Sequence, residues 1–191
     1  LSISLPNGET FTSKETMEPE QKVDSITVKI DKDKVEDKLE DHKSEGATRE
    51  DILDTVDVYK IRIFAREPQD IENFYMFRFY RNQERLHAGE EEQVYFSDDN
   101  LLGGSIQGLE GVGSLYKGDT AGFELYSITR QAFVFLNDVT NVVFSDGGMT
   151  SPPPANPRSN IKNPNGRALG YFMVASVDRK NLIVGPDKIS P

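Results

Sequence analysis

The chain of 191 residues contains no cysteine. Disulfide bonds, thiolate nucleophiles and cysteine-ligated zinc or iron–sulfur centres are therefore excluded for it. It contains only two histidines, His42 and His87, and both stand among strongly polar neighbours. That setting is typical of exposed side chains rather than of a general base or a metal ligand. We expect no catalytic residue and no metal site.

Long apolar runs and excess positive charge are also missing. No run of apolar residues approaches the roughly 18 residues that a membrane-spanning helix requires. The apolar start Leu1–Leu5 is too short for a signal peptide and lacks its basic residues. With 22 Lys and Arg against 32 Asp and Glu, the net charge is −10. This charge disfavours nucleic acid and anionic membrane surfaces as partners.

Alternating apolar residues predict several strands. Val58–Arg66 places Tyr59, Ile61, Ile63 and Ala65 on one face. Phe74–Tyr80 is aromatic on both faces, and we expect the two strands to pair antiparallel at a sheet centre, where aromatic pairs stabilise sheets. The same aromatic strip is alternatively a ligand platform. Further short strands are predicted within 26–30, 94–96, 123–126 and 182–184, with a long loop over 81–93.

The glycine-rich stretch 98–113 predicts a loop, because Asp, Asn and Gly are turn residues. A cation cradle is the alternative. Its glycines match neither a dinucleotide-binding nor a phosphate-binding motif, and we expect no cofactor.

One helix is predicted near residues 129–144. Its apolar residues recur every three or four positions and form a stripe along one face: Ile128, Ala132, Phe135, Leu136, Val139, Val142 and Val143. Thr129 suits the N-cap, and Ile128 with Phe133 suits a hydrophobic staple. Many short strands with one helix predict a mainly β fold, namely an antiparallel β-sandwich with immunoglobulin- or fibronectin-like layers and a packed helix.

After the helix, Ser151–Pro157 contains four prolines and predicts an extended crossover. Ala168–Val177 is apolar on both faces, which predicts a closing strand covered on both sides. We divide the chain into residues 1–22, a linker or the end of a missing N-terminal β-domain; residues 23–185, the sandwich with a charged insert at 31–54; and a tail at 186–191. The insert predicts a solvated helix or flexible loop.

Several motifs occur in order between Gly118 and Val177. They are Gly118-Asp119, Ser127-Ile128, the aromatic helix with Phe133 and Leu136, Pro152-Pro153-Pro154-Ala155-Asn156, Ser159-Asn160-Ile161 and Leu169-Gly170-Tyr171-Phe172. In this order they resemble the C-terminal part of the family called domain of unknown function 4249. That family usually has a lipidated cysteine and an N-terminal β-domain, and this sequence contains neither. We therefore interpret the chain as a fragment or a cleaved form of a longer protein.

The resemblance also implies a biological setting. Members of the family are lipoproteins of Bacteroidetes, commonly encoded beside TonB-dependent outer-membrane receptors. It implies a non-catalytic accessory lipoprotein at the outer membrane, the cell surface or in the periplasm, with a lipid anchor upstream of Leu1. Its partner would be the TonB-dependent receptor or another envelope protein, or it would capture a nutrient. The family has no catalytic motif to carry over to this sequence.

The loop Ser151–Arg167 is the predicted contact surface, because an extended proline-rich segment loses little entropy on docking. Its candidate residues are Pro152, Pro153, Pro154, Asn156 and Asn160. The loop alternatively does no more than connect the helix to the next strand. A second hypothesis is a glycan- or peptide-binding module that uses the aromatic residues Tyr95, Tyr116 and Tyr126. A hydrolase, the third, would need a pocket with converging acid and base groups.

Overall fold

The computed structural model describes residues 1–43, 46, 48–53, 57–68, 71–87, 95–98, 105–144, 156–166, 168–185 and 189–190, with the backbone alone at 53, 95, 98, 189 and 190. The strands are β1 (Ser2–Ser4), β2 (Thr10–Thr12), β3 (Ser25–Ile30), β4 (Val58–Arg66), β5 (Phe74–Arg81), β6 (Glu84–Leu86), β7 (Tyr95–Asp98), β8 (Ser105–Glu110), β9 (Leu115–Tyr116), β10 (Thr120–Ile128), β11 (Ser176–Ile183) and β12 (Ile189–Ser190). The helices are α1 (Lys32–Asp41), α2 (Arg49–Leu53) and α4 (Arg130–Val143).

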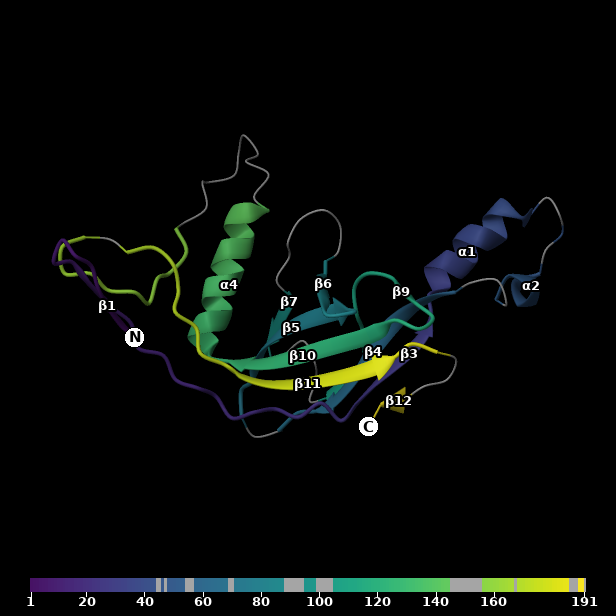
Figure 1. The fold of residues 1–191 in the computed structure, drawn as a ribbon, viewed down its shortest axis with the longest axis horizontal. Helices are drawn as coiled ribbons and strands as arrows, with labels where there is room; N and C mark the ends of the chain where they lie inside the picture. Colours follow the sequence, from purple (N-terminus) through teal and green to yellow (C-terminus); the bar gives the residue numbers. More distant parts are fainter. Residues whose placement is uncertain are drawn as a thin grey trace.

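Two antiparallel sheets form the body of the molecule (Figure 1). One has the order β11-β10-β5-β6, with β7 beside β5, and the other has the order β12-β3-β4-β8, with β9 beside β4. Side chains from both sheets meet in one apolar core, as alternation along each strand requires. The predicted mainly β sandwich with one helix packed on it is confirmed.

Strand β10 lies between β11 and β5 in its sheet. Phe123 and Leu125 are fully buried, and the Phe123 ring lies 6.1 Å from the Phe77 ring and 5.3 Å from the Phe79 ring, measured between centroids. The predicted pairing of β4 with β5 is wrong, because β5 pairs with β10 and β4 pairs with β3. The two strands belong to opposite sheets, where their apolar faces meet in the same core.

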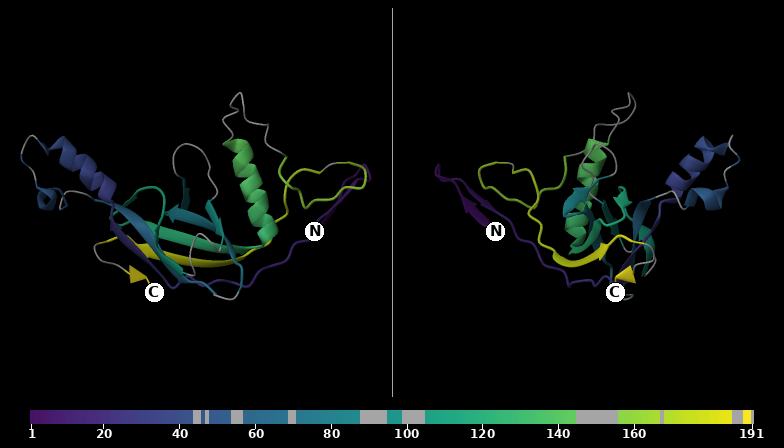
Figure 2. Two further views of the ribbon diagram at one scale, coloured as in Figure 1. Left: turned by 180° about the vertical axis from the view of Figure 1, so that it is seen from behind. Right: turned by 45° about the vertical axis from the view of Figure 1, so that its right-hand side comes forward.

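Helix α4 begins as predicted and rises steeply from the end of β10 (Figures 1 and 2). The Thr129 side chain caps it by accepting a hydrogen bond from the Ala132 amide, at 3.1 Å. Ile128 and Phe133 both belong to a second apolar cluster on the outer face of the sheet. The predicted stripe is wrong for the last turn, where Val142 and Val143 are exposed because the helix extends past the sheet.

The predicted closing strand 168–177 is also wrong, since residues 168–175 form no strand and β11 begins only at Ser176. Tyr171, Met173 and Ala175 instead pack against the second cluster, and the Tyr171 ring stacks on Phe135 of α4 at 4.9 Å. The side-chain amide of Asn160 pairs with the backbone of Phe172, where a strand would have a neighbouring strand. An apolar pattern on both faces therefore does not require a sheet partner.

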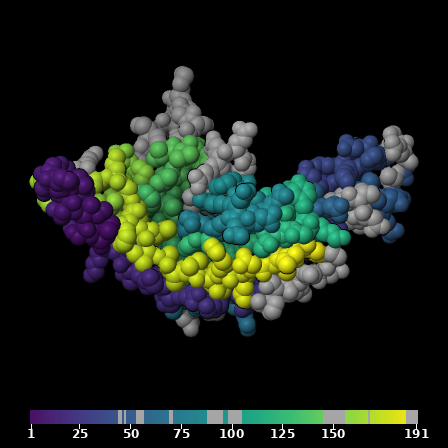
Figure 3. Space-filling view, viewed as in Figure 1, coloured from purple at the N-terminus to yellow at the C-terminus, as the bar shows by residue number. Residues whose placement is uncertain are grey.

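The charged insert forms the two helices α1 and α2 within its described residues. Asp31 caps α1, and α2 packs against it through a small apolar cluster centred on Val35 and Ile52. Figure 3 shows these helices as a separate lobe at one end of the molecule. The described helices include none long and apolar enough to cross a membrane.

Two strands lie where the sequence predicted loops. β5 turns into β6 through Asn82 and Gln83, which both have positive φ, so a short hairpin replaces the start of the long loop. β8 lies inside the glycine-rich stretch, where Gly108 has φ +74° and the register with β4 shifts between Ile63 and Phe64. This is a β-bulge, in which glycine supplies the left-handed conformation.

The ends of the chain also contribute strands. β1 and β2 form a hairpin within residues 1–22, and Thr12 pairs with Lys162 through two backbone hydrogen bonds. β12 lies within the segment predicted as a tail and pairs with β3. The division into linker, domain and tail stays a prediction.

We expect Phe123→Ala to lower the free energy of unfolding by about 3–5 kcal/mol, because it leaves a cavity between the sheets. Phe144→Ala is the matched control, since Phe144 is 50% exposed, and its loss should stay below about 1 kcal/mol. Urea melts of both variants measure the difference. Equal losses would contradict the placement of the core.

Candidate functional site

The outer face of the β11-β10-β5 sheet is the first candidate site. Register places Glu124 opposite Arg78 on β5 and opposite Arg179 on β11. Tyr80 and Tyr126 lie on the same face, because side chains two apart along a strand point the same way. We call these five residues the tyrosine–arginine face. The second apolar cluster, against which Tyr126 also packs, lies at the neighbouring end of this sheet face.

Glu124 organises the face although it is only 4% exposed. Its carboxylate accepts hydrogen bonds from the Tyr80 and Tyr126 hydroxyls, both at 2.5 Å, and from the Arg179 Nε at 2.8 Å. Burial works to raise the pKa of this carboxyl, but the hydrogen bonds from Tyr126, Tyr80 and Arg179 outweigh it and lower the pKa below its ordinary value. Glu124 is therefore ionised near neutral pH and holds three side chains in place.

Each tyrosine of the face also lies beside an arginine. The Arg78 guanidinium lies over the Tyr126 ring, 4.9 Å from its centroid, and donates to the Tyr126 hydroxyl at 3.1 Å. The Arg179 guanidinium lies 5.6 Å from the centroid of the Tyr80 ring. Burial and the Glu124 carboxylate raise the pKa of Tyr126, so its hydroxyl remains protonated. Two cations against one carboxylate leave these five side chains with one net positive charge.

A cavity of about 200 Å³ adjoins the tyrosine–arginine face, where β10 has a glycine. Its lining residues are Tyr80, Gln83, Thr120, Gly122, Arg179 and Asn181. A Cβ atom at Gly122 would lie 2.9 Å from the Asn181 Oδ1 and 3.2 Å from the Tyr80 Cβ. A larger residue at Gly122 would therefore occupy the space between these two side chains.

A second cavity, of about 380 Å³, lies between α4 and the loop that follows the proline-rich segment. Its lining residues are Arg130, Gln131, Val134, Arg158, Ser159, Asn160 and Tyr171. The Arg158 Nε lies 3.4 Å from the Asp138 carboxylate on α4, while its side chain is 75% exposed. The loop thus meets the helix through an ion pair and leaves both arginines at the cavity.

The N-terminal segment holds this loop in place. The Tyr171 hydroxyl donates to the Glu15 carboxylate, and the Asn160 amide donates to Glu15 at 3.3 Å and to the Phe172 carbonyl at 2.8 Å. Burial, with Glu15 as the second cause, raises the pKa of Tyr171 to about 12. Ser13 donates to the Asn160 carbonyl at 3.0 Å. These contacts join segments about 150 residues apart in the chain.

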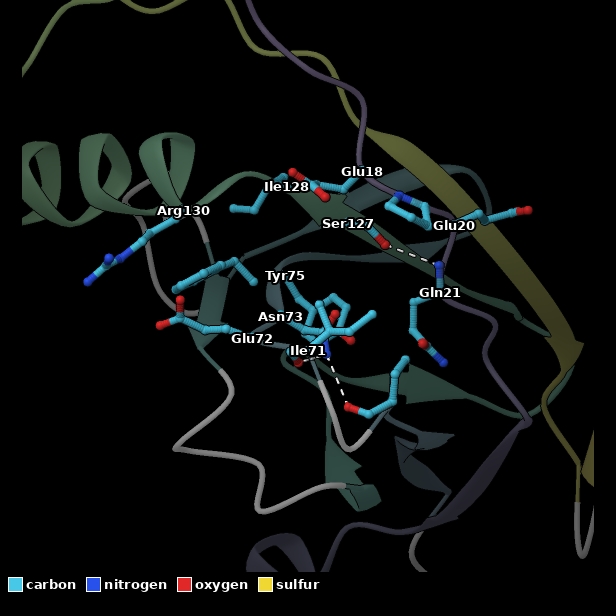
Figure 4. Close-up of a pocket in the computed structure, with 13 residues that line it drawn as sticks. Glu18, Glu20, Gln21, Ile71, Glu72, Asn73, Tyr75, Ser127, Ile128 and Arg130 are labelled. Carbon is cyan, nitrogen blue, oxygen red and sulfur yellow. Dashed lines mark hydrogen bonds between the residues drawn. The ribbon is translucent and has the colours of Figure 1, made fainter.

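A third cavity, of about 220 Å³, lies between the N-terminal segment and the turn before β5 (Figure 4). The backbone N–H of Gln21 donates to the Ser127 hydroxyl at 3.1 Å across it. Glu18, Glu20 and Glu72 also line it. Of the residues that the structure describes, no three His, Cys, Asp or Glu are grouped to hold a metal ion. We assign no ligand to this cavity.

The residues predicted to contact a partner have different surroundings in the structure. Asn156 is exposed, whereas the Asn160 side chain braces the loop from inside. Pro152, Pro153 and Pro154 lie outside the described residues, as does the Tyr95 side chain.

The proposed aromatic residues are also placed apart. Tyr126 is part of the tyrosine–arginine face, while Tyr116 lies on β9 of the opposite sheet with the Arg81 guanidinium 4.6 Å from its ring. Glu124 and Arg179 were not predicted as site residues, although strict alternation along 123–126 places Glu124 on the face opposite the core.

The fold and these surfaces define a two-layer β-sandwich domain with preformed cavities on one outer face and beside one helix. Residues 1–181 match the family described as domain of unknown function DUF4249, and the chain belongs to that family. The match includes the run Gly118–Val177, where the resemblance is strongest, and the weaker resemblance over Phe11–Phe79. No curated protein and no solved structure matches the chain.

We expect Glu124→Gln to cost roughly 1–3 kcal/mol near pH 7, because an ionised acceptor of hydrogen bonds is replaced by a neutral amide. The folded pKa of Glu124 is lowered from 4.5. Its stabilising contribution is therefore complete above that pH and is lost as pH falls through the folded value. Urea melts should show the gap between variant and wild type closing as the pH falls progressively below 4.5.

Glu84→Gln is the matched control for that variant, because Glu84 is exposed on β6. Its effect should stay within about 0.5 kcal/mol at every pH. A Glu124→Gln gap that stays constant with pH would contradict the lowered pKa.

For the loop, we expect Asn160→Ala to cost roughly 1–3 kcal/mol, since it removes both hydrogen bonds to the Phe172 backbone. The exposed Asn156 supplies the matched control, Asn156→Ala, with an expected change within about 0.5 kcal/mol. Hydrogen exchange at the Phe172 amide should accelerate only in the first variant. An unchanged exchange rate there would show that Asn160 does not brace the loop.

Proposed function

We propose that the chain is a non-catalytic binding domain of a cell-envelope lipoprotein that binds a partner protein or a nutrient for TonB-dependent uptake. Membership of the DUF4249 family supports this proposal, together with the setting beside TonB-dependent receptors that the resemblance implies. In this proposal the full-length protein is anchored by lipid at the outer membrane. It faces the cell surface or the periplasm.

The observation that carries the proposal is the braced loop beside α4. Residues 156–166 form no long strand or helix, yet Asn160, Tyr171 and Glu15 hold them beside a cavity of about 380 Å³. A surface already held in one conformation loses less entropy when a partner docks.

Charge indicates what kind of partner this surface suits. Arg130 and Arg158 both line the cavity, and none of its described lining residues is acidic. Two carboxylates lie beside it: Asp138 pairs with Arg158, and Glu15 accepts hydrogen bonds from Asn160 and Tyr171. The chain as a whole has a net charge of −10, so a cationic surface differs in sign from the whole molecule. Oppositely charged surfaces steer association and fix orientation. We therefore expect an acidic segment of the partner to contact this surface.

A glycan- or peptide-binding module is the second candidate. The tyrosine–arginine face favours it, because aromatic rings, guanidinium groups and a hollow lie together on one sheet face. The two candidates are compatible, since the face and the loop are separate surfaces of the same domain.

Binding to the receptor encoded beside the gene tests the first candidate. We expect the purified full-length lipoprotein to bind that receptor in biolayer interferometry. The double variant Arg130→Ala with Arg158→Ala should weaken binding about tenfold, or about 1.4 kcal/mol. The double variant Lys32→Ala with Lys117→Ala removes the same charge from exposed sites elsewhere and should bind normally. Absence of binding by the wild type would contradict the receptor as the partner.

A further inference from the structure

The cavity at Gly122 combines groups that differ in chemistry and point to one kind of ligand. The Tyr80 ring provides an aromatic wall, Gln83 and Asn181 provide amides, and Thr120 provides a hydroxyl. Amides and hydroxyls both donate and accept hydrogen bonds, as a ligand rich in hydroxyl groups requires. Tyrosine presents an apolar ring beside a polar end, which suits ligands with both characters.

Arg179 adds a positive charge at the edge of the cavity. Its Nε and Nη2 atoms donate to the Glu124 carboxylate, and its side chain remains 60% exposed. A guanidinium carries five N–H groups, so three of them remain for a ligand. Because a guanidinium binds carboxylates in a fork of parallel hydrogen bonds, this group suits a ligand that carries a carboxylate.

The size of the cavity limits the ligand further. Its volume of about 200 Å³ is below the roughly 300–1,000 Å³ of pockets that enclose drug-sized ligands. It therefore suits one ring. Gly122 keeps this space open, since a Cβ atom there would lie 2.9 Å from the Asn181 amide oxygen.

The groups that would bind the ligand are also held in position beforehand. Glu124 fixes the Tyr80 hydroxyl and the Arg179 guanidinium at the same carboxylate. Gln83 lies in the β5–β6 turn, which neighbouring hydrogen bonds between Asn82 and Thr120 hold against β10. Side chains that are ordered before binding lose less entropy when the ligand arrives.

We infer that the cavity at Gly122 binds a hexuronate ring, an acidic sugar that is free or part of a glycan. The sugar hydroxyls pair with Thr120, Gln83 and Asn181, an apolar ring face contacts Tyr80, and the carboxylate binds Arg179. This inference rests on the proposed role as a binding domain and names the class of its nutrient ligand.

Isothermal titration of the purified chain with D-galacturonate and D-glucuronate tests the inference. We expect saturable binding of at least one of them with a Kd on the order of 1 mM or tighter. D-galactose and D-glucose should bind at least about tenfold more weakly, because they lack the carboxylate. Acetate should also bind at least about tenfold more weakly, because it lacks the sugar hydroxyls.

Variants locate the site. Asn181→Ala should weaken uronate binding about fivefold or more, and Gly122→Ala should abolish it by occupying the hollow. Asn137→Ala on the exposed surface of α4 is the matched control and should bind as the wild type does. Urea melts identify loss of folding in Gly122→Ala, and Asn181→Ala then decides the location.

Each contrary result overturns the inference. Equal affinity for neutral sugars would show that the carboxylate is not recognised. Equal affinity for acetate would show a simple anion site. The absence of saturable uronate binding would show that the cavity is not a uronate site. Wild-type affinity of Asn181→Ala would move the site elsewhere. The receptor-binding measurement is independent: receptor binding without uronate binding refutes only this inference, while absence of receptor binding contradicts the receptor as the partner.

Discussion

The two-sided environment of β10 is the constraint on which the rest of the structure depends. Phe123 and Leu125 are fully buried between the sheets, so strand geometry directs Glu124 and Tyr126 to the opposite face. Because β5 and β11 flank β10, that face receives arginines from both neighbours. Burying the core thus also assembles a polar network around one nearly buried carboxylate, which hydrogen bonds keep ionised.

Helix α4 lies between two surfaces of the molecule, the tyrosine–arginine face and the braced loop, and contacts each through different residues. Its first turns pack on the sheet, where the Phe133 ring lies 5.0 Å from the Phe74 ring, and they cover the apolar end of the outer face. Its other flank packs against the segment 168–175. Asp138 on the same helix forms an ion pair with Arg158 of the loop. One helix therefore borders both the tyrosine–arginine face and the braced loop, while α1 and α2 project at the other end of the molecule (Figure 1).

Sequence patterns predicted the structure correctly where neighbouring residues alone determine it. The Thr129 cap and the alternation of β4 follow from the chemistry and spacing of adjacent residues, and both are present. The predicted strand at 168–177 was wrong because apolar residues on both faces indicate that a segment is buried, not what it packs against. Here residues of this segment pack against the flank of a helix rather than within a sheet. The hairpin at Asn82-Gln83 was missed because its positive φ angles occur without the usual glycine.

The sequence by itself determined the mainly β class, the position of one capped helix, the family and the absence of cysteine chemistry. Periodicity and composition express the short-range preferences that decide these properties. Only the tertiary structure decided that β4 and β5 lie in opposite sheets, that Asn160 braces a loop, and that Glu124 gathers Tyr80, Tyr126 and Arg179. Those contacts join residues that are mostly tens of positions apart, and their partners are selected by packing of the whole chain rather than by local pattern.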